Sequence, residues 1–143
     1  MKKFAIFLAI IIIIVVQITY VYINYQNNQK EIQKENIIYE DYFEKETNGL
    51  GIASIINKAM DSNYNNEIQK NNNGKYISND TNSIEIDIKM LDNDTTYNME
   101  TIFNGQVELF ATYYRDIKFK CTKLEYHNKT KRVKYMLFEQ ITK

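Results

Sequence analysis

An uncharged stretch from Phe4 to Ile23 constrains this 143-residue chain more than any other feature of its sequence. Helical residues rise by about 1.5 Å each, so a stretch of this length spans roughly 30 Å, the hydrocarbon thickness of a bilayer. It consists mainly of Ile, Leu, Val and Phe, interrupted by the polar residues Gln17 and Thr19. Amphipathic rings favour the membrane–water boundary, and three tyrosines lie at its far end: Tyr20, Tyr22 and Tyr25. We therefore predict a transmembrane anchor over residues 1–23.

A cleaved secretory signal peptide is the alternative interpretation of the same residues. Such peptides carry an apolar core of about 7–15 residues and end in small residues at the cleavage site. The stretch here is longer, and residues 18–24 have no Ala-x-Ala-like pattern. We therefore favour an uncleaved anchor.

Basic residues predict the orientation of this anchor. Lys2 and Lys3 precede the span, and the next cation is Lys30, seven residues beyond it. Positive residues are enriched on the cytoplasmic side of spans. The pattern predicts a single-pass protein of the cell membrane, with a cytoplasmic N-terminus and with everything after Asn24 outside the cytoplasm.

The remainder of the chain, about 120 residues, is long enough for one small domain. Abundant Asn, Ile, Lys and Tyr, all with AT-rich codons, are typical of an AT-rich bacterial genome. The single cysteine, Cys121, excludes an intramolecular disulfide and a Cys-based structural zinc site. Its alternation with Ile117 and Phe119 predicts burial, and pairing with another chain is the alternative.

Residues 24–48 are polar and mostly helix-favouring, which predicts a helical stalk ahead of an extracytoplasmic domain at residues 49–143. The clearest helical pattern in that domain covers residues 50–62. Its apolar residues recur at helical spacing on one face: Ile52, Ile55, Ile56, Ala59 and Met60. The asparagine-rich residues 61–74 that follow are typical of a loop.

Alternation of apolar and charged residues from Ile84 to Met90 predicts a strand with one wet face. A turn at residues 91–95 and a short returning strand at 96–99 follow. Residues 100–114 read as a helix that Gly105 weakens. Its inward positions are Ile102, Phe103, Val107, Phe110 and Tyr114.

The C-terminal residues 117–138 read as a β-hairpin. The alternation slips in phase near Thr122–Lys123, which predicts a β-bulge there. Residues 127–131 supply the turn, with His127, the only histidine of the chain, at its start. Together these elements predict an α+β domain: a small antiparallel sheet with two packed helices, behind the transmembrane helix and stalk.

Asp92-x-Asp94-x-Thr96 after an apolar strand is similar to the nucleophile motif of haloacid-dehalogenase-type phosphatases. That resemblance implies Asp92 as nucleophile, Asp94 as acid/base, Thr96 as a structural partner and Mg²⁺ as cofactor. A calcium loop using Asp92, Asp94 and Glu100 is a further hypothesis. Asn and Asp also dominate ordinary turns, and we favour a hairpin turn, with no cofactor, no metal and no catalytic residue.

The charges divide unequally along the chain. Residues 24–114 hold seven lysines and fifteen acidic residues, whereas residues 115–143 hold nine basic and three acidic ones. Four hairpin residues would form a cationic surface suited to anionic lipid or cell-wall polymers: Lys118, Lys120, Arg132 and Lys134. For the unequal charges of the two halves, we favour the alternative of charge complementation within the fold. For the hairpin, we favour the alternative of a sheet face with solvated lysines.

A long N-terminal helix, half apolar and half stalk, followed by a small antiparallel sheet resembles the plan of type IV pilins and pseudopilins. Residues 3–8 carry neither the leader glycine nor the glutamate of that family. The chain also looks like small single-pass membrane proteins of AT-rich Gram-positive bacteria. We expect a membrane-anchored, non-enzymatic binding or assembly domain with an envelope protein as partner and no nucleic acid, and a pilin-like subunit of a secretion or DNA-uptake apparatus as the alternative.

Overall fold

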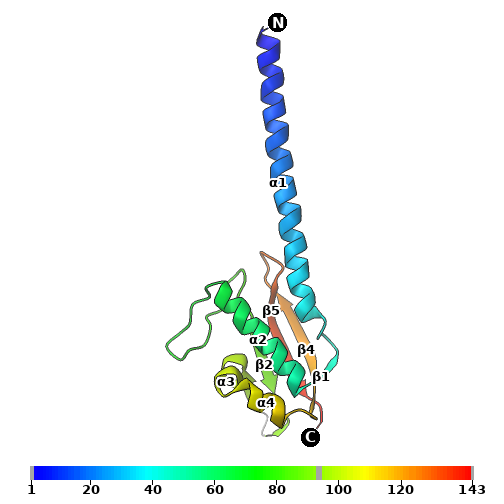
Figure 1. Cartoon of the computed structure of the whole chain (residues 1–143), viewed down its shortest axis with the longest axis vertical. Coiled ribbons are helices and arrows are strands. Elements are labelled where there is room, and N and C mark those ends of the chain that lie inside the picture. Colours follow the sequence, from blue (N-terminus) through cyan, green and yellow to red (C-terminus); the bar gives the residue numbers. More distant parts are fainter. Residues whose placement is uncertain (1, 93–94, 143) are drawn as a thin grey trace. The chain divides into compact units, whose positions relative to one another are not determined.

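The apolar N-terminal stretch lies in one helix, α1 (Lys2–Glu40), of the computed structural model, which describes residues 2–92 and 95–142 (Figure 1). α1 is long and apolar enough to cross a membrane, and its membrane-length window has 0% of its residues buried within the protein. A helix that is apolar all round and has no protein neighbours suits a lipid environment. The structure is therefore consistent with a single-pass anchor.

The chain divides after Lys34 into two units, residues 1–34 and residues 35–143. The first unit is helical. The second begins with the last turns of α1, and α1 ends at Glu40. Residues 46–48, at the end of the predicted stalk, form the strand β1 (Glu46–Asn48).

The second unit is an α+β fold built on one five-stranded mixed sheet, with strand order β1-β4-β5-β2-β3. The other strands are β2 (Glu85–Lys89), β3 (Thr96–Asn98), β4 (Lys118–Tyr126) and β5 (Val133–Gln140). The accompanying helices are α2 (Gly49–Asn65), α3 (Met99–Asn104) and α4 (Val107–Tyr113). In Figure 1, α2 lies across the sheet, with α3 and α4 beside it.

The sheet is not purely antiparallel, so that part of the sequence prediction is wrong. β5 pairs with β2 in parallel, while the other neighbouring strands are antiparallel. A hydrogen bond links the segments that precede these two strands: His127 Nε2, in the turn before β5, lies 2.8 Å from the carbonyl oxygen of Ser83, just before β2. Side chains alternate in the same way in parallel and antiparallel strands, so periodicity does not predict the parallel pair.

The predicted apolar stripes form the core. On α2, Ile52, Ile55 and Ile56 are fully buried, and Ile86 and Ile88 of β2 are buried on the sheet face they share. Burying each such side chain contributes roughly 1.5–3 kcal/mol. Remaining large core side chains come from the hairpin and α3: Phe119, Val133, Met136, Phe138 and Met99.

Three further features of the hairpin match the sequence prediction. The register of β4 and β5 shifts between Cys121 and Lys123, at the expected bulge. Cys121 itself is fully buried. His127 begins the turn, its backbone N–H donates to the carbonyl of Arg132 at 2.8 Å, and its side chain is buried.

The helix predicted for residues 100–114 is broken in two. α3 ends at Asn104, and Gln106 adopts a left-handed backbone with φ of 70° before α4 begins at Val107. Gly105 precedes this break and is the residue that weakens the helical pattern. The break turns α4 relative to α3, and a concave surface lies between the two helices.

Candidate binding groove

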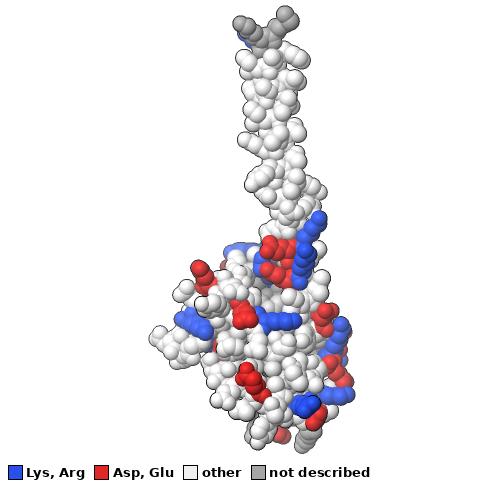
Figure 2. Space-filling view, in the orientation of Figure 1, with Lys and Arg blue, Asp and Glu red and all other residues white. Residues whose placement is uncertain are grey.

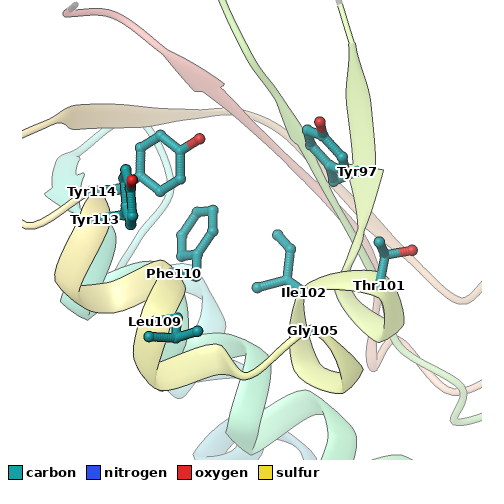
Figure 3. A pocket seen from close by; sticks show the side chains of 8 residues that line it. All are labelled: Tyr97, Thr101, Ile102, Gly105, Leu109, Phe110, Tyr113 and Tyr114. Carbon is teal, nitrogen blue, oxygen red and sulfur yellow. The ribbon is translucent and has the colours of Figure 1, made fainter.

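An aromatic groove lies where α3, α4 and β3 meet (Figure 3). Its volume is about 370 Å³, near the lower end of the range for ligand pockets. Eight residues line it: Tyr97, Thr101, Ile102, Gly105, Leu109, Phe110, Tyr113 and Tyr114. None of them carries a formal charge, so the groove suits an apolar or neutral group.

Local capping positions the wall of the groove that α3 provides. Asn98, at the end of β3, is the N-cap of α3, and its Oδ1 accepts hydrogen bonds from Thr101 N at 2.9 Å and Thr101 Oγ1 at 2.8 Å. Such caps satisfy the otherwise unpaired amides of the first helical turn. The same residues therefore join Tyr97 of the sheet edge to Thr101 and Ile102.

The aromatic floor of the groove continues into the core. The rings of Phe110 and Tyr114 have centroids 4.6 Å apart, and both contact Phe119 of β4, at 6.1 and 6.0 Å. Aromatic pairs at such separations contribute about 0.5–1.5 kcal/mol beyond their area burial. The floor is thus anchored to the sheet.

Gly49 holds the end of α4 close to the start of α2. Its backbone N–H donates to the carbonyl oxygen of Tyr114 at 2.8 Å. A Cβ atom at this position would lie 2.6 Å from that same oxygen. Glycine therefore permits the close approach that sets the position of Tyr114.

The outer wall of the groove is exposed. The side chain of Tyr113 is 84% exposed and that of Leu109 is 55% exposed. Figure 3 shows the Tyr113 and Tyr114 rings at one end of the groove and Tyr97 at the other. An anchored floor with an exposed apolar wall is the anatomy of a surface that gains contacts when a partner covers it.

Tyr114 contributes a hydroxyl group to this site. Partial burial, reinforced by the nearby Tyr97, Asp92 and Tyr113, raises the pKa of the Tyr114 phenol above its ordinary value of 10.0. The ordinary pKa of a phenol already keeps Tyr114 neutral at physiological pH, and the upward shift extends that neutrality to more alkaline pH. The groove offers hydroxyl groups at its rim and ring faces within it.

The aspartates of the phosphatase and calcium hypotheses are only partly described. Asp92 is exposed, and Asp94 lies outside the described residues. Thr96 lies in β3 opposite Lys89. Glu100 is buried, and its Oε1 accepts a hydrogen bond from the backbone N–H of Tyr76 at 3.0 Å. Glu100 thus has a structural partner. The phosphatase hypothesis requires that Mg²⁺-dependent turnover be lost in Asp92→Asn.

The four predicted cationic residues occupy opposite ends of the hairpin. Phe119 pairs with Gln140 and Tyr126 with Val133, so Lys118 and Lys120 are separated from the second pair by the length of the strands. That second pair is Arg132 and Lys134. The structure brings the residues together two by two, and not as one cluster.

Acidic neighbours accompany these cations. Lys118 Nζ lies 2.9 Å from Glu46 Oε2, and Arg132 forms an ion pair with Glu35. Lys120 lies opposite both Glu46 of β1 and Glu139 of β5. Figure 2 likewise shows basic and acidic side chains interspersed over the visible face of the domain. These contacts are those expected of charge complementation within the fold.

The sequence does not predict the groove, because its pattern predicts one continuous helix over residues 100–114. Phe110 and Tyr114 fall on its predicted inward stripe, whereas Leu109 and Tyr113 lie off that stripe. Two apolar residues four positions apart on an outward face are a signal of exposed apolar surface. Tyr97 can be assigned to the same surface as Leu109 and Tyr113 only once the break near Gly105 is known.

Among residues 2–92 and 95–142, no three His, Cys, Asp or Glu side chains gather in a way that could hold a metal ion. Comparison of the chain with protein-family models, with curated proteins and with solved structures finds no match.

Proposed function

We propose that this chain is a single-pass membrane protein that holds a binding domain outside the cytoplasm, and that the domain binds an envelope protein through the aromatic groove. The protein acts by binding or assembly and not by catalysis. The observation that carries the proposal is the exposed apolar wall, Leu109 and Tyr113, above a floor of rings anchored to the core.

The chemistry of the groove favours an apolar or aromatic side chain of a protein as its occupant. Its lining residues are uncharged, and tyrosine is among the residues enriched at the energetic centres of protein interfaces. A volume of about 370 Å³ admits one or two large side chains. Covering a Tyr ring that is 84% exposed removes a large apolar face from water.

Because the protein is anchored in the membrane, a groove of this size is sufficient to bind a partner. A partner in the same membrane meets the domain at an effective concentration set by the tether and not by bulk dilution, which for short tethers is on the order of millimolar. The uncharged stretch of α1 supports the anchor, and Lys2 and Lys3 before it support a cytoplasmic N-terminus.

A photo-cross-linking residue at position 113 of the full-length protein, in its native cells, tests this proposal. Position 64 is the matched control, because Tyr64 is also strongly exposed, at 76%, but lies on α2 outside the groove. We expect a discrete adduct with one envelope protein from position 113 and none from position 64. Adding Leu109→Asp should remove the adduct.

Equal adducts from both positions, no adduct from position 113, or an adduct that persists with Leu109→Asp would each contradict binding through the groove. A thermal melt shows whether the Leu109→Asp protein is folded. Leu109 is 55% exposed, so we expect its melting temperature to stay close to that of the parent.

A pilin-like subunit is the second candidate, supported by the continuous helix α1 that runs for 39 residues from the apolar stretch into the second unit. This candidate predicts a mature protein that has lost a few N-terminal residues and that forms detergent-resistant polymers. An intact mass equal to that of the full sequence would contradict it.

A further inference from the structure

Gln17 places a side-chain amide inside the apolar stretch of α1. The middle of the stretch from Phe4 to Ile23 falls between residues 13 and 14. At about 1.5 Å per residue, Gln17 lies roughly 5 Å beyond that middle and roughly 9 Å before Ile23. Its backbone is therefore within the hydrocarbon layer of a bilayer that α1 spans.

The Gln17 amide has no hydrogen-bond partner among residues 2–92 and 95–142, and its side chain is exposed on α1. The neighbouring polar residue behaves differently, because Thr19 Oγ1 donates to the carbonyl oxygen of Val15 within the same helix at 2.8 Å. Burying an amide in hydrocarbon without a hydrogen bond costs several kcal/mol. In a membrane, the Gln17 amide therefore lacks the hydrogen bonds that it needs.

Water at the nearer end of the span does not supply these hydrogen bonds. The Cα–Cβ bonds of a helix tilt toward its N-terminus, and long side chains follow them. The amide of Gln17 therefore leans toward the middle of the bilayer and away from the boundary near Ile23. A partner within the membrane is needed.

We propose that α1 pairs in the membrane with α1 of a second copy of this chain, and that the two Gln17 amides hydrogen-bond to each other. A primary amide offers both donors and an acceptor, so two of them satisfy each other reciprocally. All copies insert with the same orientation, which makes the two helices parallel and sets Gln17 opposite Gln17 across a two-fold axis. This inference rests on the anchor of the proposed function and not on the groove.

The residues around Gln17 have the spacing of a parallel helix pair. Steps of four and three residues connect Ile6, Ile10, Ile13, Gln17 and Tyr20. Such a seam faces a partner helix along its length, and one polar residue within it fixes the register. All four of its apolar residues are exposed on the single chain, between 50% and 67%.

Sedimentation equilibrium of the full-length protein in a density-matched detergent tests the pairing. Gln17→Leu keeps a side chain of similar size and removes the hydrogen-bonding groups. We expect its dimer dissociation constant to rise by about fivefold to thirtyfold, as is typical of interhelical polar contacts in membranes. Thr19→Val is the matched control and should leave the constant unchanged, because Thr19 is satisfied by its own helix.

A wild-type protein that is monomeric, or a Gln17→Leu dimer as tight as wild type, would overturn the pairing. Alkaline carbonate extraction of the membranes separates this failure from that of the anchor. Wild type and Gln17→Leu that both stay in the membrane pellet show that the anchor holds and that the sedimentation result judges the pairing alone. Wild type released into the supernatant would overturn the anchor and the pairing together.

Discussion

Asn63 gives the buried start of β2 its hydrogen bonds. Its side chain is fully buried, and its Nδ2 donates to the carbonyl oxygen of Ile84 while its Oδ1 accepts from Ile84 N, both at 2.8 Å. Asn36 makes the same pair of contacts at the start of β5, with Lys131 O at 2.8 Å and Val133 N at 3.0 Å. In each case, an amide stands in for the neighbouring strand that the backbone lacks at that point.

Replacing Asn63 by alanine should lower the free energy of unfolding by about 2–4 kcal/mol, because it leaves a buried N–H and a buried C=O unpaired. Chemical denaturation of the full-length protein in detergent measures this loss. Asn72→Ala is the control, since Asn72 is exposed, and should change stability by less than about 0.5 kcal/mol. Equal denaturation midpoints for the two variants would contradict the role of Asn63.

Cys121 is shielded by the same core. Burial raises the pKa of its thiol from 9.0 to about 11, an effect that a hydrogen bond with the backbone of Lys123 partly offsets. At pH 8 the thiol is protonated and enclosed, and the thiolate is the reactive form. We expect maleimide to modify the denatured protein rapidly and the native protein only at the rate of unfolding. Equally rapid modification of both would contradict burial.

The same shift has a consequence for stability at alkaline pH. Above pH 9 the unfolded chain releases the thiol proton while the folded protein retains it up to about pH 11. The unfolded state then binds fewer protons, so the free energy of unfolding should fall between these two pH values. Cys121→Ser, which does not titrate there, should show a smaller fall than wild type. An equal fall would assign the alkaline instability to other groups.

At the scale of elements, opposite charges alternate across the open face of the sheet. The strand registers place Glu46 of β1 opposite Lys120 of β4, Lys120 opposite Glu139 of β5, and Glu139 beside Lys89 of β2. The Lys89 Nζ and Glu139 Oε1 atoms are 3.9 Å apart. Opposite charges on neighbouring strands stabilise the pairing, and like charges oppose it.

Lys120→Glu should lower the free energy of unfolding by about 0.5–2 kcal/mol, because it sets three acidic residues in a row across three strands. Lys120→Gln removes the charge without adding repulsion and should cost less. Added salt should narrow the difference between the two variants by screening the repulsion. A Lys120→Glu protein as stable as Lys120→Gln at low salt would show that the row of alternating charges does not contribute to stability.

The sequence predicts those elements whose periodicity is strong. The stripe of α2 and the alternation from Ile84 to Met90 identify a helix and a strand correctly, because burial repeats at the period of each structure. The loop predicted for the asparagine-rich residues 61–74 is wrong for residues 61–65, since α2 continues to Asn65 and buries Asn63. Composition alone does not show that an asparagine has backbone partners far away in sequence.

The candidate groove depends on features that periodicity does not carry. Its concavity follows from the break at Gln106, whose left-handed backbone is unusual for a residue other than glycine. Its position against β3 follows from the order of the strands, in which β5 lies between β4 and β2. Tyr97 and Tyr113 line the same groove through these tertiary relations, so the aromatic residues were visible in the sequence but the site was not.

The two units of the protein suit different environments. The first exposes an apolar helix that suits lipid, and the second buries its own core and has a mixed-charge surface. The polar end of the first unit includes two exposed lysines, Lys30 and Lys34, at which trypsin can cut. A domain held outside the cell should therefore be separable from its anchor.

Trypsin treatment of intact cells, followed by the mass of the fragment left in the membrane, tests whether α1 anchors the domain outside the cytoplasm. An uncleaved anchor with its domain outside predicts an N-terminal fragment that starts at residue 1 or 2 and ends at Lys30 or Lys34. Removal of the domain without loss of the apolar stretch would support an extracytoplasmic binding protein. A protein that trypsin leaves whole, or a mature chain that lacks residues 4–23, would contradict this account.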